Sequence, residues 1–142
     1  MRIARLRPEF VQHVPENLDE GILYISEEFA TAGHLCCCGC GEEVFTPLNP
    51  AQWKLTRDVR RDTVSLYPSI GNWNYACRSH YWIKDNRVED AGPMADYIIE
   101  RVKKRDRRDK DLYFKANNRS VHDSASNPGL LTKVYRWIFG RW

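Results

Sequence analysis

Four of the chain's five cysteines stand within five residues of one another, and this crowding constrains the fold more than any other feature. Cys36, Cys37 and Cys38 are consecutive, Cys40 follows after one glycine, and Cys77 stands alone much further along. An odd number of crowded cysteines makes a poor disulfide framework, since neighbouring cysteines rarely meet disulfide geometry. Thiolates are preferred zinc ligands, so the sequence predicts a metal site.

A second short motif supplies the other half of such a site. Cys77 and His80 are separated by two residues, and ligands at this spacing on a turn reach one ion easily. Two turns that each give two ligands would close a tetrahedron, as in structural zinc sites. The predicted zinc ligands are Cys36, Cys38, Cys40, Cys77 and His80.

The cysteine-rich loop offers more thiols than a tetrahedral site needs. Cys38 with Cys40, Cys36 with Cys38, or Cys37 with Cys40 would each give a pair with a glycine beside its second sulfur. Glycine suits a tight turn whose backbone N–H groups point at thiolates. We favour Cys38 and Cys40, with Cys36 as a third ligand or a neighbouring thiol, and the other pairs stay open.

An iron–sulfur centre of the Rieske type is an alternative to zinc. Such a centre binds one iron through two cysteines and the other through two histidines. The Cys77–His80 motif fits its second loop, but the first loop has cysteine where that pattern needs histidine.

Residues 1–92 show the alternation of short β-strands, and a helical period follows them. We therefore expect a mainly β fold, a small antiparallel sheet or sandwich with a zinc-ribbon-like metal site. A basic amphipathic helix is expected over 93–116, a flexible linker over 117–129 and an amphipathic segment over 130–142, giving α+β overall. The expected strands are 21–26, 43–46, 53–56, 63–67, 81–83 and one starting at 87–88.

Charge is distributed unevenly along the chain. Residues 1–92 carry 10 Lys and Arg against 13 Asp and Glu, whereas residues 93–142 carry 12 against 6. No apolar run approaches the ~20 residues of a membrane span. The first ten residues are charged and no apolar run follows them, so we expect no secretory signal peptide. We therefore expect a cytoplasmic protein, in a compartment where thiols stay reduced.

Three strings together resemble a known family: His34 to Val44, Ser65 to Ile70, and Cys77 to Ile83. Over residues 20–90 the chain is similar to the uncharacterised bacterial and phage domain family 6527. Members usually carry proline at the position of Cys37, which makes this thiol the weakest ligand candidate. Some members are encoded beside bacterial relatives of ubiquitin-activating, ubiquitin-conjugating and deubiquitinating enzymes. The resemblance implies a metal-binding accessory protein in a bacterial ubiquitin-like modification or phage-defence system.

The leading functional hypothesis is a non-enzymatic zinc-binding module that recruits or scaffolds protein partners. No Ser–His–Asp array and no phosphate-binding glycine loop can be recognised in the sequence. Ser69, Asn72 and Asn74 precede the second metal motif, and we expect them to hold their own loop rather than to bind a partner. The second hypothesis is a thiol-dependent enzyme or transfer factor, in which a spare cysteine of Cys36–Cys40 is the nucleophile.

The C-terminal part suggests two further contacts. Lys103–Lys110 is rich in cations that displace counterions from phosphate, so nucleic-acid binding is a third hypothesis. Interleaved aspartates weaken it, because they suit helical ion pairs with these cations. The segment Leu130–Trp142 is amphipathic; we rank docking on protein first and an anionic membrane surface second.

Overall fold

The computed structural model describes residues 1–125 of the 142-residue chain. The chain divides into two compact units, and all eight strands belong to the first, residues 1–106. The segment 130–142, for which contacts with protein or membrane are predicted, lies outside the described residues.

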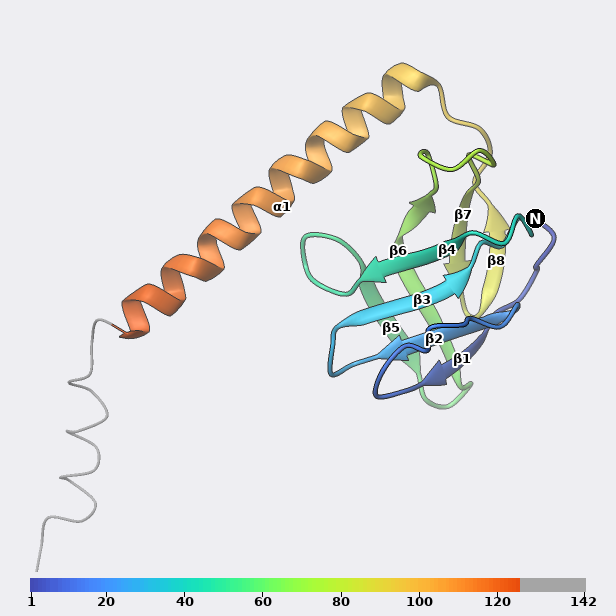
Figure 1. Cartoon of the computed structure of the whole chain (residues 1–142), viewed down its shortest axis with the longest axis horizontal. Helices are drawn as coiled ribbons and strands as arrows, with labels where there is room; N and C mark the ends of the chain where they lie inside the picture. Colours follow the sequence, from blue (N-terminus) through green and yellow to red (C-terminus); the bar gives the residue numbers. More distant parts are fainter. Residues whose placement is uncertain (126–142) are drawn as a thin grey trace, which may run out of the picture. The chain divides into compact units, whose positions relative to one another are not determined.

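The first sheet contains four strands from the N-terminal third of the chain (Figure 1). They are β1 (Arg7–Phe10), β2 (Ile22–Ser26), β3 (Thr31–Leu35) and β4 (Glu43–Pro47), in this spatial order. β1 pairs with β2 in parallel, and the other neighbours are antiparallel. β4 is an edge strand of this sheet, and the cysteine-rich loop connects β3 to it.

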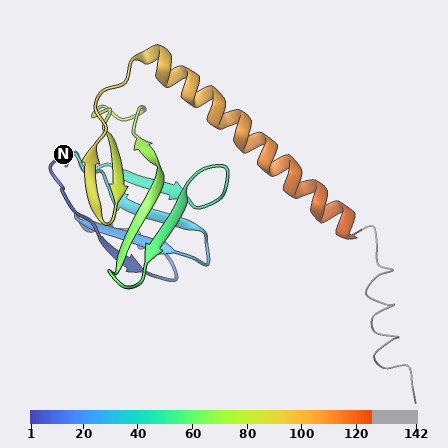
Figure 2. The ribbon, with the colours of Figure 1, turned by 180° about the vertical axis from the view of Figure 1, so that it is seen from behind.

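The second sheet is antiparallel throughout. Its strands are β5 (Lys54–Asp58), β6 (Thr63–Gly71), β7 (His80–Lys84) and β8 (Arg87–Asp90), again in this spatial order. Figure 2 shows this sheet from the side opposite to Figure 1. The loop that joins β6 to β7 carries Cys77.

One hydrophobic core joins the two sheets. It contains Leu23 and Ile25 from β2 together with Leu66 from β6 and Ile83 from β7, all almost fully buried. Burying such aliphatic side chains stabilises a fold by about 1.5–3 kcal/mol each before the entropic cost of ordering them. The prediction of a mainly β fold with a C-terminal helix is confirmed.

Six strands lie where the sequence pattern placed them, and two were not expected. β1 contains Pro8, which is tolerated because β1 is an edge strand. β3 contains Gly33 and His34, which have weak strand propensity, yet both are buried between β2 and β4. Tertiary burial outweighs local preference at such positions.

The helix α1 (Asp96–Ala125) differs from its predicted bounds of 93–116. It begins after Pro93, and its first turn contains Asp96, which forms an ion pair with Arg78. It also continues through residues expected to form a flexible linker from 117, because neither glycine nor proline interrupts 96–125. None of the described residues forms a helix with the length and apolarity needed to span a bilayer.

Candidate functional site

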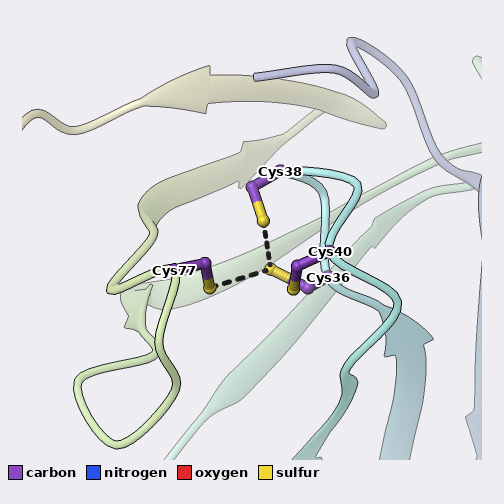
Figure 3. Close-up of side chains that lie close together, drawn as sticks. All are labelled: Cys36, Cys38, Cys40 and Cys77. Atoms are coloured by element: carbon purple, nitrogen blue, oxygen red, sulfur yellow. Dashed lines mark hydrogen bonds between the residues drawn. The ribbon is translucent and has the colours of Figure 1, made fainter.

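Four cysteines from two loops form a compact cluster (Figure 3). Cys36, Cys38 and Cys40 come from the loop between β3 and β4, and Cys77 comes from the loop between β6 and β7. All four sulfur atoms lie within 4.8 Å of one another. The Sγ atom of Cys36 is 3.4 Å from that of Cys38 and 3.9 Å from that of Cys77.

These distances fit a tetrahedral metal ion. A zinc–sulfur bond of about 2.3 Å sets the edge of a tetrahedron of sulfurs at roughly 3.8 Å. The loop is shaped for this purpose, because Gly39 adopts a φ of +88° and its N–H group donates to the carbonyl oxygen of Cys36. The residues present therefore fit a metal ion held by four thiolates.

Proton affinities in the cluster show why a cation would be stabilising. Burial, followed by hydrogen bonds with the Cys40 and Cys36 thiols, raises the pKa of Cys38 to about 12. Burial also acts to raise the pKa of Cys77, but hydrogen bonds from Ser79 and neighbouring thiols outweigh it and lower this pKa to about 7. Crowded thiolates repel one another, and a bound divalent cation would favour ionisation of all four.

Cys37 stands apart from the cluster although it lies between two of its members. Its side chain is fully buried in the hydrophobic core, and burial raises the pKa of its thiol to about 12. A neutral, inaccessible thiol is a poor nucleophile. The other four cysteines all belong to the cluster, and Cys40 among them is exposed, so the predicted thiol-dependent enzyme stays a hypothesis.

His80 lies outside the cysteine cluster and contacts a serine instead. Its Nε2 atom is 3.0 Å from Oγ of Ser69, and its Nδ1 atom is 3.1 Å from the carbonyl oxygen of Gly92. Both ring nitrogens thus have partners other than sulfur. The structure brings together four of the five sequence-predicted ligands and places the fifth in a Ser–His pair.

The partners of the imidazole fix its tautomer. A carbonyl oxygen only accepts hydrogen bonds, so Nδ1 must carry the proton that is donated to Gly92. In the neutral ring Nε2 is then unprotonated and accepts the hydroxyl proton of Ser69. This is the arrangement that a serine nucleophile and its general base require.

A bulge in β6 brings Ser69 to the imidazole. Leu66 pairs with Ile83 and Ile70 pairs with Tyr81, so four steps along β6 match two steps along β7. Ser69 lies in this irregular stretch, next to Pro68. Bulges commonly re-aim a side chain beside an active site.

The indole of Trp73 packs against the ring of His80. Its ring centroid lies 4.9 Å from that of His80, with the planes tilted by 56°. The same indole covers Gly71, where any Cβ atom would collide with it. His80 is almost fully buried, so Ser69, Gly92 and Trp73 together restrict how its ring can turn.

Buried hydrogen bonds connect the cluster to the strands beside the Ser–His pair. The Nδ2 group of Asn72 donates to Oγ of Ser79 over 2.9 Å and reaches Sγ of Cys36 over 3.5 Å. Tyr81 continues the network to Nε2 of His34 over 2.8 Å. Burial lowers the pKa of His34 to about 4, so this ring is neutral at pH 7.

Three of the six cations in residues 103–110 of α1 form ion pairs with acids. Lys103 lies 3.4 Å from Glu100, Arg105 lies 3.3 Å from Asp106, and Arg108 pairs with Asp109. Such exposed pairs contribute roughly 0–1 kcal/mol each and are typical of a solvated helix face. Nothing in the described residues supports the nucleic-acid hypothesis for Lys103–Lys110.

Comparison with known proteins supplies a family. The model of the family described as bacterial ubiquitination-like system serine protease (BubE) matches residues 10–91. No curated protein and no solved structure matches the chain. This match confirms the expected link to a bacterial ubiquitin-like system. Such a link also suggests protein partners, as expected from the sequence. Because the match covers more than half of its residues, the chain belongs to the BubE family.

Proposed function

We propose that this protein is a serine protease of a bacterial ubiquitination-like system, with Ser69 as nucleophile and His80 as general base. One observation carries the proposal: Oγ of Ser69 and Nε2 of His80 are 3.0 Å apart, with Nδ1 directed at a carbonyl oxygen. The family description names a serine protease, which supports this assignment. A backbone carbonyl, that of Gly92, orients the histidine where many such enzymes use a carboxylate.

The chemistry follows from this geometry. Oγ of Ser69 attacks the carbonyl carbon of a peptide bond while its proton passes to Nε2 of His80. The protonated imidazole then gives this proton to the leaving amine as the carbon–nitrogen bond breaks, leaving an ester on Ser69. A water molecule, deprotonated by the same nitrogen, hydrolyses the ester and restores both side chains.

The cysteine cluster has a structural role in this proposal. Cys36, Cys38, Cys40 and Cys77 would hold one metal ion, for which zinc is the best candidate, and would leave no open position for water. Four sulfurs in one group also differ from the two-cysteine, two-histidine set of a Rieske centre. When bound, the ion would link the β3–β4 loop to the β6–β7 loop. The segment 77–80 then holds the backbone of His80 in place.

The non-enzymatic scaffold expected from the sequence stays a prediction. The sequence favours a scaffold because no catalytic array can be recognised in it. The proximity of Ser69 to His80 removes that reason. Binding of protein partners is compatible with either function. A protease of such a system must bind its protein substrates. The two hypotheses therefore differ in whether the bound protein is cleaved, not in whether a protein is bound.

Hydrolysis of p-nitrophenyl acetate and of fluorescently labelled casein tests the proposal. We expect Ser69→Ala and His80→Asn each to lower the rate by about 100-fold or more, as loss of a nucleophile or general base does. Ser65→Ala is the matched control: Ser65 lies on the same strand and accepts a hydrogen bond from the Asp85 N–H group. Full activity of Ser69→Ala would contradict the proposed function.

A further inference from the structure

The Ser–His pair lies on the outer face of the second sheet. Side chains alternate between the two faces of a strand, and in β7 the side chains of Tyr81 and Ile83 are buried in the core. His80 and Trp82 therefore lie on the opposite face. Oγ of Ser69 contacts His80, so this partly exposed side chain lies on the same face. A polypeptide that presents a peptide bond to Ser69 therefore crosses the outer face of this sheet.

Two aromatic side chains occupy this face beside the pair. Tyr67 is 66% exposed, and its ring stacks on that of Trp82 with 6.1 Å between the centroids. Trp82 is two residues beyond His80 in β7, about 7 Å along the strand, and Tyr67 is two residues before Ser69 in β6. Because the two strands are antiparallel, both rings lie on one side of the Ser–His pair. We call Tyr67 and Trp82 the aromatic platform.

The aromatic platform is placed to meet a bound substrate. An extended chain advances about 3.3 Å per residue, so its second residue from the scissile bond lies about 7 Å from Oγ of Ser69. The platform has the same spacing from the pair along β7. Stacked rings present a large apolar area with few rotatable bonds, and tyrosine and tryptophan are enriched where proteins bind other chains. A large apolar side chain at that second position would be removed from water by contact with the platform.

Cations border the aromatic platform. Lys54 pairs with Tyr67 across β5 and β6, so the two side chains stand next to each other on the same face. Nζ of Lys84 lies 5.1 Å from the centre of the Trp82 ring and 2.9 Å from a carboxylate oxygen of Glu89. Lys54 is exposed and forms no ion pair within the part of the chain that the structure describes. Its charge therefore favours an acidic residue in a chain that lies on the platform.

We propose that the aromatic platform is a substrate subsite, which binds a large apolar side chain of a polypeptide that carries an acidic residue beside it. The bound side chain belongs to the second residue from the scissile bond, on the side of the Ser–His pair where Tyr67 and Trp82 lie. The inference rests on the proposed protease function and names two residues that determine its specificity. Contact with the rings selects the apolar side chain, and Lys54 selects the acid.

Internally quenched octapeptides test the preference with the full chain. The parent peptide contains only alanine and glycine, phenylalanine replaces each position in turn, and mass spectrometry locates the cleaved bond. We expect phenylalanine at the second position on one side of that bond to raise kcat/KM by about tenfold or more, as a hydrophobic contact of this size does. The same replacement on the other side should give no such gain, because the platform lies on one side only. A gain at neither position would overturn the inference.

Removal of either ring should abolish the preference. In Tyr67→Ala and in Trp82→Ala the kcat/KM values for the phenylalanine and parent peptides should become nearly equal. Phe29→Ala is the matched control, because Phe29 is an exposed aromatic residue between β2 and β3 that stacks on His13, and it should keep the preference. A preference that persists in both platform variants would overturn the subsite. So would a platform variant that changes only the oligomeric state, since the rings would then bind a second copy of the chain.

A charge reversal tests the role of Lys54. Glutamate or lysine is placed next to the phenylalanine of the best peptide. The unaltered protein should prefer glutamate by about threefold, the size of an exposed ion pair, and Lys54→Glu should reverse the order. Arg60→Glu makes the same change of charge in the exposed β5–β6 turn and should leave the order as it was. An unchanged order in Lys54→Glu would overturn the selection of an acidic residue.

A binding measurement separates this inference from the proposed function. If no Ser69-dependent hydrolysis is found, the serine chemistry fails, and the platform is tested by adding a hexapeptide with a central phenylalanine–glutamate pair to Ser69→Ala. We expect a chemical-shift change at the indole N–H group of Trp82, and we expect Tyr67→Ala to abolish it. No change, or changes confined to other indole groups, would overturn the platform as a peptide-binding surface.

Discussion

Cys77 and His80 are three residues apart in the chain but face two different sites. Sγ of Cys77 lies 3.9 Å from Sγ of Cys36, whereas Nε2 of His80 lies 3.0 Å from Oγ of Ser69. Between them, Oγ of Ser79 lies 3.1 Å from the same Cys36 sulfur. The thiol cluster and the Ser–His pair therefore share one short stretch of backbone, and a disturbance of the cluster should displace the imidazole.

Metal removal should weaken both stability and hydrolysis. We expect one zinc ion per chain. A ligand present at about 1,000 times its Kd stabilises the folded state by about 4 kcal/mol. Each kcal/mol changes the melting temperature by about 4 °C, so chelation should lower it by roughly 15 °C. Calorimetry with and without a chelator measures this, and added zinc should restore both melting and Ser69-dependent ester hydrolysis. An unchanged melting temperature in metal-free protein would rule out the cluster as a structural metal site.

Single cysteine variants should divide into two classes. Cys38→Ser should bind substoichiometric metal, because it removes one sulfur from a four-sulfur set. Cys37→Ala should keep full metal content and lose only about 1 kcal/mol, since it deletes one buried atom from the core. Plasma mass spectrometry of both purified variants gives the metal content. Loss of metal from Cys37→Ala alone would reverse our assignment of the ligands.

Gly92 should control turnover through the histidine tautomer. Its φ is +76°, and its carbonyl oxygen accepts a hydrogen bond from the Nδ1–H group of His80. Alanine is strained by about 1–2 kcal/mol in this conformation and should shift that carbonyl oxygen. We expect Gly92→Ala to lower kcat by about 10-fold or more, with little change in KM.

Gly21 supplies a matched control for this prediction. It also has a positive φ, +82°, and, as at Gly92, a Cβ atom added there would meet no other atom within 4 Å. Gly21→Ala should therefore destabilise the fold by a similar amount without changing kcat. Equal kcat values for the two variants would show that the Gly92 carbonyl oxygen does not orient the base.

Asn72 should contribute strongly to stability. Its amide donates to Ser79 and reaches both Cys36 and Tyr81 in the buried interior. Removing one partner from buried polar groups costs about 1–3 kcal/mol, so urea unfolding of Asn72→Ala should show a loss in this range. Asn49→Ala, which removes hydrogen bonds in a less buried turn, should cost less. A smaller loss for Asn72→Ala than for Asn49→Ala would contradict the role of the network.

Much of the fold follows from local sequence patterns. Alternating side chains and turn residues locate β6 and β7, and the crowded cysteines mark their own loop. The segment of β3 could not be recognised locally, because Gly33 and His34 form a strand only through pairing with β2 and β4. Long-range burial decided its structure.

The Ser–His pair was hidden for a similar reason. Ser69 and His80 have no characteristic spacing, and their contact depends on the bulge that offsets β6 against β7. The Cys77–His80 spacing resembles a ligand pair, but β7 begins at His80, and its side chain meets β6 rather than the thiol loop. Between the Leu66–Ile83 and Ile70–Tyr81 pairs, four steps along β6 match two steps along β7, and this offset could not be read from either strand alone.

Covalent labelling of Ser69 tests the central claim most directly. A fluorophosphonate reacts with a serine only when a base activates its hydroxyl group. Intact-mass measurement of metal-loaded protein should show one adduct per chain, mapped to Ser69 and lost in both Ser69→Ala and His80→Asn. An unmodified wild-type chain, or an adduct that persists in Ser69→Ala, would contradict the assignment of Ser69 and His80 as nucleophile and base.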